Sequence, residues 1–566
     1  MPRSIPVRWP PVYDLLLLPA MGRGNACQGL PVLAPLVHDH SKPVGRIQRR
    51  EERNPRSSWH SSRILFSEVW GVGESPKATC SVPCILLFPV SWMGSERRRS
   101  DMELTMRAFS RGLSLIGLLL PGLTVSLALA RMEAEWLPPP LWGPNEVANS
   151  DRSGFAQQEP SLAIHPQDPW NLVVAAKDFR RTQDITREVW IYVSFDGGRS
   201  WPIQLPFPGL PPAITRQSDP VALAAENGRF YVLVLGAGTP AYRHHGLFLT
   251  WSDDGGRTWR DAVTVISEPS TVLDDKPWLA RDNRPGSPFY GRLYVAWRPM
   301  HADVLWMVHS GDGGLSWSPP VTAAEGEGVQ GAMPVIGADG AVHLFYVEPM
   351  SPTTPGEIRV VTSFDGGRSF SAPRTVAHVL QPPSPVRPYD RWRLYTLPSA
   401  AADPSDANRL YVTWTELSTR GDLGTEVVFA RSEDGGRTWS VSVPFAAPGD
   451  AAHPIVRTDS RGWVHLFWLD RRRDPGNRLF DAFYAYSPDG GRTWSLPFRV
   501  SSRSFDLNVG VPPISPAPGD YWGLDVARDR VCAAWSDTRF GDEDIMVACG
   551  ILPASARLLL PRVPLW

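Results

Sequence analysis

Three short segments of the chain combine an aspartate with an arginine two positions later, a pattern that could either hold a loop together or bind a ligand. The pairs are Asp178 with Arg180, Asp470 with Arg472, and Asp537 with Arg539. A carboxylate and a guanidinium can pair through two hydrogen bonds, so each pair could tie adjacent loops together. Alternatively, the arginines could form a rim that binds a carboxylate, phosphate or sulfate group of a ligand. The residue types alone allow both interpretations.

Further charged residues and two tyrosines stand immediately before short apolar segments. They are Glu159, Asp219, Asp274, Asp275, Lys276, Tyr389, Asp390, Arg391, Asp520 and Tyr521, while Glu416 follows another apolar segment. Tyr521 could be a core aromatic that packs over Gly519 and Gly523.

Several other kinds of site are not indicated. No His/Cys cluster has the spacing of metal ligands, and no glycine-rich phosphate loop or G-x-S-x-G motif occurs. His244 and His245 form a lone pair that we expect to be solvated. The formal net charge of the 566 residues is −1, so no nucleic-acid partner is implied. We therefore expect no metal and no cofactor.

An eight-residue motif, S-x-D-G-G-x-[ST]-[WF], recurs through the chain and indicates the strands that must position these residues. Its aspartates are Asp196, Asp254, Asp312, Asp365, Asp434 and Asp489. Asp-Gly-Gly between apolar segments is typical of a β-hairpin turn, because glycine accepts a positive φ and aspartate accepts hydrogen bonds from its own turn. We expect these six aspartates to be structural.

Strand-like segments accompany every copy of the motif. Before the first copy lie Glu159–Ile164, Leu172–Ala176 and Val189–Val193, and a fourth segment follows the motif. The motif aspartates are 53 to 69 residues apart, and four antiparallel strands that recur at such a spacing are typical of the blades of a β-propeller. The fold class is therefore predicted to be all-β, with residues 145–552 as a propeller of four-stranded antiparallel blades.

A last unit lacks the motif. Asp520–Val526, Val531–Trp535 and Asp544–Ala548 repeat the first three strands of a blade, but no fourth strand follows. Propellers avoid leaving such an edge unpaired, so we expect Asn145–Asn149 to supply an N-terminal strand that closes this blade. Seven blades are predicted, with six as the alternative.

Two cysteines lie in this last unit. If Ser536 stands opposite Ile545 in a simple antiparallel hairpin, then Cys532 stands opposite Cys549. A disulfide between them would pin the hairpin, and export from the cytoplasm would permit it. Two buried free thiols are the alternative.

The candidate site residues are expected on one face of the ring. In an up-and-down blade the motif turns lie on one face, and the loops that join second to third strands and one blade to the next lie on the other. The charged residues named above fall in those other loops. They should therefore surround the central channel on the face away from the motifs.

The region upstream of the propeller shows none of these repeats. Residues 1–101 are interpreted as disordered or as an upstream translation absent from the mature protein. Residues 102–130 combine a basic start, an apolar stretch and a small-x-small end, which are the parts of a secretory signal peptide; a single membrane anchor is the alternative. Residues 131–144 are a proline-containing linker, and residues 553–566 are a C-terminal tail.

The motif as it stands at Ser194–Trp201 resembles the Asp box, or BNR repeat, and residues 145–550 resemble propellers of the sialidase (neuraminidase) superfamily. Gly519–Arg539 and Leu273–Asp282 are similar to segments of secreted bacterial BNR-repeat proteins. The resemblance implies a propeller that acts on glycans. The Arg-Ile-Pro segment that usually precedes the first box in sialidases is absent from this sequence.

The resemblance also implies roles for particular residues. In a sialidase a tyrosine activated by a glutamate is the nucleophile, an aspartate is the acid/base, and three arginines bind the substrate carboxylate. Matched by role, these residues are Tyr521 as nucleophile, Glu416 as its partner, Asp178 or Asp275 as acid, and Arg391, Arg472 and Arg539 as carboxylate ligands, with Lys276 as a further substrate-binding residue.

Two functions are therefore open. One is an exo-α-sialidase or a related glycoside hydrolase that acts on glycans, and the other is a non-catalytic propeller that binds a polysaccharide or a cell-surface protein. Either would be a monomeric protein that is secreted, periplasmic or at the cell surface, with no membrane span after signal cleavage. The absent Arg-Ile-Pro segment favours binding, and the clustered Arg, Asp and Tyr residues favour catalysis.

Overall fold

The computed structural model describes residues 137–151, 153–180, 187–238, 244–268, 274–351, 354–419, 424–510 and 518–554. These residues form 29 β-strands and no helix. The expected upstream extension, the signal peptide and nearly all of the C-terminal tail lie outside the described residues. In the part of the chain that is described, no helix is available to cross a membrane.

Six antiparallel sheets of four consecutive strands follow one another along the chain. Blade 1 contains β3 (Gln157–Ile164), β4 (Leu172–Asp178), β5 (Glu188–Ser194) and β6 (Ile203–Pro206). Blade 2 contains β7 (Arg216–Ala224), β8 (Phe230–Ala237), β9 (His245–Ser252) and β10 (Val263–Glu268). Blade 3 contains β11 (Asp274–Arg281), β12 (Leu293–Pro299), β13 (Val304–Ser310) and β14 (Val321–Glu325).

The next three blades repeat this order. Blade 4 contains β15 (Gln330–Ile336), β16 (Val342–Glu348), β17 (Gly356–Ser363) and β18 (Arg374–Val379). Blade 5 contains β19 (Ser399–Ala402), β20 (Leu410–Leu417), β21 (Thr425–Ser432) and β22 (Ser440–Ser442). Blade 6 contains β23 (Ala451–Thr458), β24 (Val464–Asp470), β25 (Asp481–Ser487) and β26 (Phe498–Arg499).

The seventh blade joins the two ends of the propeller. Its strands β27 (Gly523–Ala527), β28 (Arg530–Asp537) and β29 (Asp544–Ile551) are consecutive, and β29 also pairs with β1 (Leu141–Trp142) and β2 (Glu146–Val147). The predicted N-terminal closing strand is thus confirmed. β1, which falls within the expected linker, adds a second short strand to the same edge.

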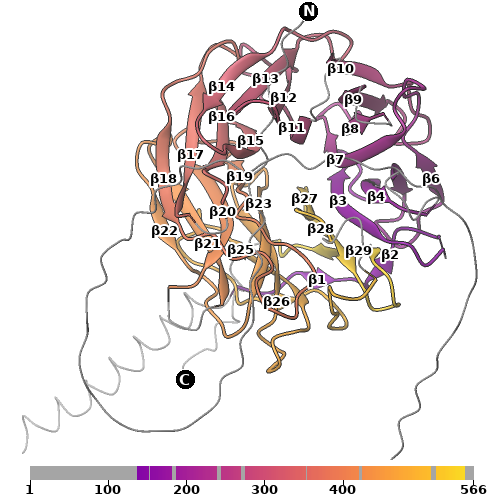
Figure 1. The fold of residues 1–566 in the computed structure, drawn as a ribbon, viewed down its shortest axis with the longest axis vertical. Coiled ribbons are helices and arrows are strands. Elements are labelled where there is room, and N and C mark those ends of the chain that lie inside the picture. Colours follow the sequence, from indigo (N-terminus) through magenta and orange to yellow (C-terminus); the bar gives the residue numbers. More distant parts are fainter. Residues whose placement is uncertain are drawn as a thin grey trace, which may run out of the picture. The chain divides into compact units, whose positions relative to one another are not determined.

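The seven blades close into a ring (Figure 1). The first strand of each blade contacts the first strand of the next, and β27 of the last blade contacts β3 of the first. In Figure 1 the indigo strands β1 and β2 lie beside the yellow β29, where the ring is joined. The prediction of a seven-bladed all-β propeller is therefore confirmed.

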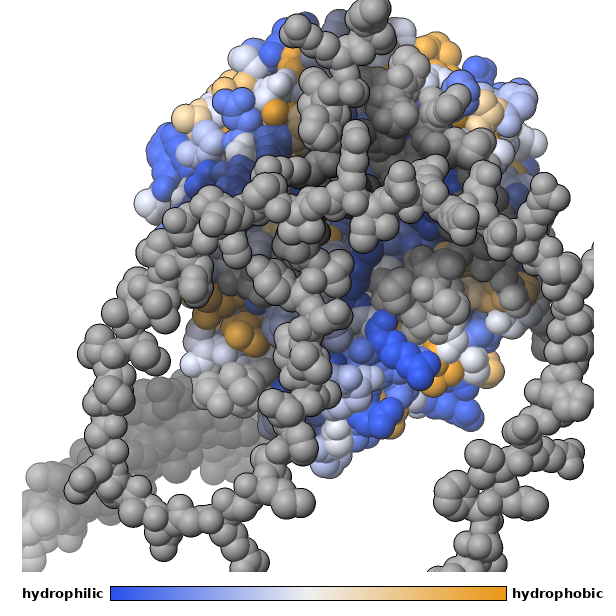
Figure 2. Space-filling model, in the orientation of Figure 1, coloured by the Kyte–Doolittle hydropathy of each residue, from blue (hydrophilic) through white to orange (hydrophobic). Residues whose placement is uncertain are grey.

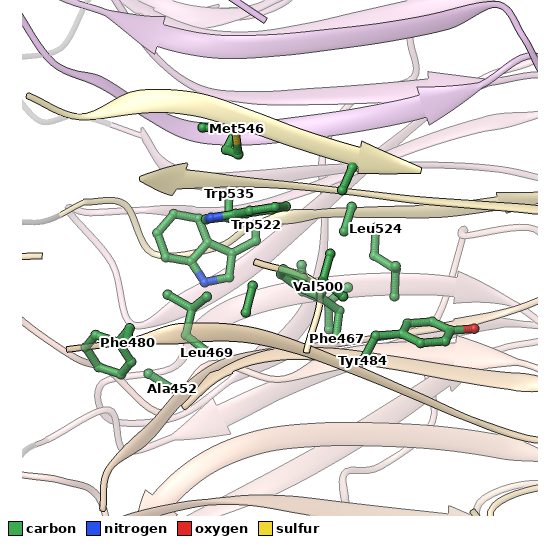
Figure 3. Packing of buried hydrophobic residues seen from close by; sticks show 14 of the residues in the cluster. Ala452, Phe467, Leu469, Phe480, Tyr484, Val500, Trp522, Leu524, Trp535 and Met546 are labelled. Atoms are coloured by element: carbon green, nitrogen blue, oxygen red, sulfur yellow. The ribbon is translucent and has the colours of Figure 1, made fainter. Parts of the chain in front are cut away.

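Large apolar side chains fill the space between neighbouring blades. Between blades 6 and 7, Phe467 and Tyr484 of blade 6 pack against Trp522, Leu524 and Trp535, and all five side chains are buried (Figure 3). Burial of aromatic rings of this size contributes strongly to stability. The blades are thus held as one body, which fixes the residues at the centre of the ring.

Asn149 fastens the joint between the two ends. Its side-chain amide donates to the carboxylate of Asp544 at 2.7 Å and to the side-chain oxygen of Gln157 at 2.9 Å, and its oxygen accepts from the backbone amide of Ile545 at 2.9 Å. All of these groups are buried. Asn149 therefore links blade 7 to the first strand of blade 1.

The disulfide predicted in this blade is present. Cys532 and Cys549 are bonded, and the strand register places Ser536 opposite Ile545 and Cys532 opposite Cys549. The bond joins β28 to β29, the strand that receives the N-terminal strands. It therefore stabilises the hairpin on which ring closure depends.

Each of the six motif turns is closed by its own aspartate. In the first, Ser194 Oγ donates to Asp196 Oδ1 and accepts from Gly198 N, and Asp196 accepts from both the amide and the hydroxyl of Ser200. Gly197 and Gly198 have φ values of 77° and 84°, which other residues rarely adopt. The same contacts recur at Asp254, Asp312, Asp365, Asp434 and Asp489.

The register gives the central channel two distinct ends. Ile164, the last residue of β3, stands opposite Leu172, which stands opposite Ser194 of the first motif. The C-terminal ends of the first strands therefore point to the face of the motif turns, which we call the box end. The N-terminal ends of the same strands define the opposite face, which we call the bulge end.

Candidate functional site

A β-bulge interrupts the first strand of five blades at the bulge end. The register with the second strand shifts after Gln158, Ser218, Asp275, Gln330 and Ala452. The next residue in each case has a positive φ: Glu159 (56°), Asp219 (53°), Lys276 (51°), Gly331 (75°) and His453 (50°). A bulge re-aims the side chain of its extra residue.

Four of these five residues are not glycine, so the backbone there is strained. A left-handed conformation costs roughly 1–2 kcal/mol for such a residue, and strain of this kind concentrates at functional sites. In the described residues, the first strands of the two remaining blades have no such bulge, but Leu397 and Tyr521 occupy the equivalent positions. They lie two residues before the first paired residues of β19 and β27, just as each bulge residue lies two residues before pairing resumes. We call the seven residues the bulge ring: Glu159, Asp219, Lys276, Gly331, Leu397, His453 and Tyr521.

Lys276 and Tyr521 form the aromatic part of this ring. The ammonium nitrogen of Lys276 lies 3.5 Å from the centroid of the Tyr521 ring and 5.3 Å from that of Trp278. The Tyr521 hydroxyl donates to the carbonyl of Pro220 at 3.0 Å. A cation over an aromatic face is attracted by the ring quadrupole, and more strongly where water is excluded. Lys276 is thus held as a buried cation, and its burial lowers its pKa.

Two acidic members of the ring lie beside these residues. Lys177 pairs with Glu159 at 3.0 Å, and the other carboxylate oxygen of Glu159 is buried and accepts no hydrogen bond from the described residues. Asp219 accepts from the hydroxyl of Ser218 at 2.6 Å and from the backbone amide of Lys276 at 3.2 Å. Burial, followed by the repulsion of Asp219, raises the pKa of Glu159 although Lys177 opposes this.

Asp275 and Asp520 are a second pair of carboxylates in the same cluster. Burial, together with the charges of Asp219 and Asp520, raises the pKa of Asp275 from 3.8 to about 7. Burial also disfavours the charged form of Asp520, but Arg393 outweighs it and lowers the pKa of Asp520 to about 2. Arg393 reaches both Asp520 oxygens, at 2.8 and 3.3 Å. Near neutral pH Asp275 therefore keeps a substantial protonated fraction, while Asp520 is ionised.

His453 completes the charged side of the site. Its ring packs edge-on against Trp522 at 5.2 Å, and its Nε2 is buried without a hydrogen-bond partner among the described residues. Burial lowers its pKa to about 4, so the imidazole is neutral. A neutral imidazole with an unpartnered nitrogen is available to a ligand.

A cavity of about 40 Å³ lies at the centre of this constellation. Its lining includes Lys276, His453, Asp520 and Tyr521 together with Trp278. On the face seen in Figure 2, hydrophilic side chains extend towards the middle of the ring between the grey segments. Among the described residues, no group of three or more His, Cys, Asp or Glu is arranged to hold a metal ion.

Three of the residues expected at a site lie together. Tyr521 and Lys276 line the cavity, and Asp275 interacts electrostatically with Lys276 and with Asp520. Asp275 is oriented by Gln330, whose side-chain amide donates to it at 2.8 Å. The expected face of the propeller is therefore the one on which these charged residues gather.

The expected arginine clamp does not form around Tyr521. Arg472 and Arg539 pair with their own aspartates, Asp470 at 2.5 Å and Asp537 at 2.6 Å, so these side chains are already engaged within their loops. Arg391 is exposed, and within the described part of the chain it is hydrogen-bonded only through its backbone amide, which donates to Asn508 at 2.7 Å. None of the three arginines lines the cavity that Tyr521 lines.

Asp178 and Glu416 also lie outside this cavity. Asp178 pairs with Arg180 at 2.7 Å and accepts from the Tyr192 hydroxyl at 2.8 Å, so all three Asp-x-Arg pairs form. Arg472 and Arg539 also donate to neighbouring segments, to the carbonyl of Phe445 and the hydroxyl of Ser502. Glu416 accepts from the indole of Trp414 at 2.9 Å. Burial raises the pKa of Glu416 to about 7, but its neighbours do not include Tyr521.

Arg393 and His453 are the site residues that were not expected from the sequence. The segment before β19 is irregular, so no alternation shows that Arg393 rather than Arg391 faces the channel. For His453 a signal was present: it is one of four polar residues, with Glu159, Asp219 and Lys276, that directly precede a proline at the start of a first strand.

Comparison with known families agrees with the repeat and the fold. The family model described as a BNR repeat-like domain matches residues 291–510. Residues 291–510 are thus similar to a BNR repeat-like domain. Blades 1 and 2 with their two motif turns lie before the matched residues, and blade 7 lies after them. No curated protein matches the chain in sequence.

Several solved structures are similar to the propeller at low identity. The intramolecular trans-sialidase of leech is 14% identical with a TM-score of 0.41, over 58% of this chain and 67% of that one. A protein of unknown function from Dyadobacter fermentans is 14% identical with a TM-score of 0.42, over 73% and 100%. The α-L-arabinanase of Penicillium chrysogenum is 11% identical with a TM-score of 0.40, over 73% and 99%.

Proposed function

We propose that this BNR-repeat propeller is a glycoside hydrolase whose site is the bulge end of the channel. The observation that carries the proposal is the pair of half-buried carboxyl groups of Asp275 and Asp520, which act on each other electrostatically at the bulge end. Gln330 donates to Asp275 at 2.8 Å and Arg393 donates to Asp520 at 2.8 Å, and the pKa of Asp275 is raised to about 7 while that of Asp520 is lowered to about 2. Two carboxyl groups whose environments separate their pKa values in this way can act as acid and base at the same pH.

In this proposal Asp275 is the general acid and Asp520 the ionised carboxylate. Asp275 donates its proton to the glycosidic oxygen as the bond between that oxygen and the anomeric carbon breaks. Asp520, held by Arg393, stabilises the positive charge that develops on the sugar or takes a proton from the water that adds to it. Lys276 and Arg393 supply donors for hydroxyl or carboxylate groups of the substrate.

Tyr521 is not proposed as the nucleophile. Burial and the surrounding carboxylates raise its pKa well above 10, and its hydroxyl is bound to a backbone carbonyl. Both effects oppose formation of the phenolate that would have to attack the sugar. We propose instead that the aromatic face of Tyr521 positions Lys276.

The size of the cavity favours a second candidate, a propeller that binds a glycan without cleaving it. A cavity of about 40 Å³ is much smaller than the cavity of about 150 Å³ that holds benzene. A sugar ring would have to bind at the mouth of this cavity, above the bulge ring. Such a protein would bind through Lys276 and Arg393 without using Asp275 as an acid.

The test is hydrolysis of a panel of fluorogenic glycosides, including a sialoside and an α-L-arabinofuranoside, by the intact chain. Hydrolysis should fall by a factor of about 10² or more in Asp275→Asn, and remain within a few fold in Tyr521→Phe. Asp434→Asn, at the box end, is the matched control. Loss of hydrolysis in Tyr521→Phe alone would refute these roles. If the folded protein cleaves none of the panel but retains glycans on an array, the binding function replaces the hydrolase.

We further propose that the protein works outside the cytoplasm, as a secreted, periplasmic or cell-surface protein. The disulfide between Cys532 and Cys549 supports this, because such bonds persist mainly in oxidising compartments. Detection of the protein in the culture medium or in a surface fraction would test it. Retention in the cytoplasm with both thiols reduced would refute it.

A further inference from the structure

A second cavity occupies the box end of the same channel, away from the proposed active site. Its volume is about 260 Å³, and it is lined by the C-terminal halves of the first strands, including Leu162, Val221 and Val335. Trp278 and Met333 line both this cavity and the smaller one at the bulge end. We call it the box-end cavity.

Two arginines line the box-end cavity without a carboxylate partner. Arg284 belongs to the turn after β11 in blade 3, and Arg457 to β23 in blade 6, so they reach the channel from different sides of the ring. Among the described residues neither forms a salt bridge, and Nε of Arg284 is buried without a hydrogen-bond partner. Arg457 donates to the carbonyl of Val456 at 2.9 Å. Burial lowers the pKa of both guanidinium groups, but arginine stays charged.

The other charged side chains of the lining do not neutralise both arginines. Arg281 contacts the carboxylate of Glu226. The Asp525 carboxylate accepts from the backbone amides of Ile164 and Val526, both at 2.8 Å. Asp282 acts on Arg284 through its charge but does not line the cavity. Within the lining itself, Arg284 and Arg457 are accompanied by the single carboxylate of Asp525, while the charges of Asp282 and Asp403 act on Arg284 from outside the lining.

The rest of the wall is apolar. Leu162, Val221, Leu223, Trp278 and Met333 cover the lining between the arginines. A cavity of about 150 Å³ is large enough to hold benzene, so this one has room for an aromatic or aliphatic body with a charged head. Because most of this wall is apolar, a carboxylate with an organic body fits the cavity better than inorganic phosphate.

We propose that the box-end cavity binds a small monoanionic carboxylate, with Arg284 and Arg457 on the carboxylate and the apolar wall around its body. Guanidinium groups suit this role because their planar donors match the two carboxylate oxygens. The site is separate from the proposed hydrolytic site and does not depend on that activity. Because Trp278 lines both cavities, a ligand here also contacts the side chain against which Tyr521 packs at 5.5 Å.

Benzoate is the probe for this site, titrated into the intact chain by calorimetry and by tryptophan fluorescence. Binding of one benzoate per chain is expected, with an affinity at least tenfold weaker in the double variant Arg284→Gln, Arg457→Gln. Arg461→Gln is the matched control, because Arg461 also lies at the box end but is paired with Asp459 at 2.6 Å. Inorganic phosphate should bind more weakly than benzoate.

A comparison of ligands keeps the proposal testable if the double variant fails to fold. Benzamide has the shape of benzoate without its charge, so it should not compete with benzoate in the unaltered protein. Absence of saturable benzoate binding, equal binding of benzamide, or unchanged affinity in the folded double variant would each overturn the proposal. None of these results depends on whether a glycoside is hydrolysed.

Discussion

The ammonium group of Lys276 lies 3.5 Å from the centre of the Tyr521 ring, at a backbone position where Lys276 itself is strained with φ of 51°. The strained bulge turns the lysine across the channel, from blade 3 to blade 7. Lys276 also acts on the carboxyl of Asp275, whose pKa it lowers. The cation thus connects the aromatic part of the bulge ring to its acid.

Removal of this cation should change the pH dependence of the proposed hydrolysis. Lys276→Met takes away a charge that favours ionised Asp275, so the pKa of Asp275 should rise and the alkaline limb of the activity profile should move to higher pH. Lys276→Arg keeps the charge and should leave the limb in place. The rate of glycoside hydrolysis between pH 4 and 9 measures this; a limb that moves to lower pH in Lys276→Met would contradict it.

Asp275 should also make stability depend on pH. Its pKa is about 7 in the folded protein and ordinarily 3.8, so the unfolded chain loses this proton first as the pH rises. The contribution of protonated Asp275 to the free energy of unfolding is therefore full below pH 3.8 and is lost as the pH rises to about 7. Asp275→Asn removes this loss, so the variant should gain stability relative to the unaltered protein across that window, up to about 4 kcal/mol. Denaturant unfolding from pH 4 to 8 measures the difference, and a gain that shrinks with pH would refute it.

Asn149→Ala should weaken ring closure. The substitution removes three buried hydrogen bonds and leaves Asp544, Gln157 and the amide of Ile545 short of a partner, at about 1–3 kcal/mol for each group left unsatisfied. Ser150→Ala, at the exposed neighbouring position, should cost little. Thermal unfolding of both variants provides the comparison. Equal melting temperatures would show that Asn149 does not hold the joint.

Loss of the disulfide should destabilise the last blade. The bond closes a loop of 17 residues, for which constraint of the unfolded chain is worth about 3 kcal/mol. The double variant Cys532→Ser, Cys549→Ser should therefore unfold at lower denaturant concentration, and a reducing agent should shift the unaltered protein in the same direction. The same reagent should leave the double variant unchanged, and any shift there would point to another cause.

An Asp-box substitution should affect stability and spare the proposed activity. In the fifth box, hydrogen bonds from Thr438 and Ser432 lower the pKa of Asp434 to about 2, and these bonds vanish in Asp434→Ala. We expect a loss of about 1–3 kcal/mol and hydrolysis within a few fold of the original. Unfolding and rate measurements on one sample would separate the two, and a large loss of rate without loss of stability would contradict the structural role.

The fold was predictable because the Asp-box motif occurs six times and each copy predicts the same hairpin turn. The boxes around Asp196 and its equivalents fix one turn in each of blades 1 to 6, and the positions of the neighbouring strands follow from that turn. The pairing of Cys532 with Cys549 followed from counting along a hairpin, since a β-ladder keeps its register unless a bulge intervenes.

The site was predictable only in part, because it is built on such bulges. A bulge inserts one residue and re-aims its side chain, which the alternation of a strand does not reveal. Tyr521, Asp275 and Lys276 were found from their charge and position, but Arg391 was chosen where Arg393 faces the channel. Arg472 and Arg539 were predicted to bind a ligand, but each instead forms an ion pair with the aspartate two residues before it.

The pairing of the N-terminal strands with β29 also sets an order of events during synthesis. Asn149 and its partner Asp544 are 395 residues apart, so β2 leaves the ribosome long before the strand that it pairs with exists. Closing so long a loop is slow, and until then the edges of the growing ring stay exposed. A polypeptide that stops before β29 has no closed form available. Only a chain translated through the last blade can hide its edges from proteases and from other unfinished chains.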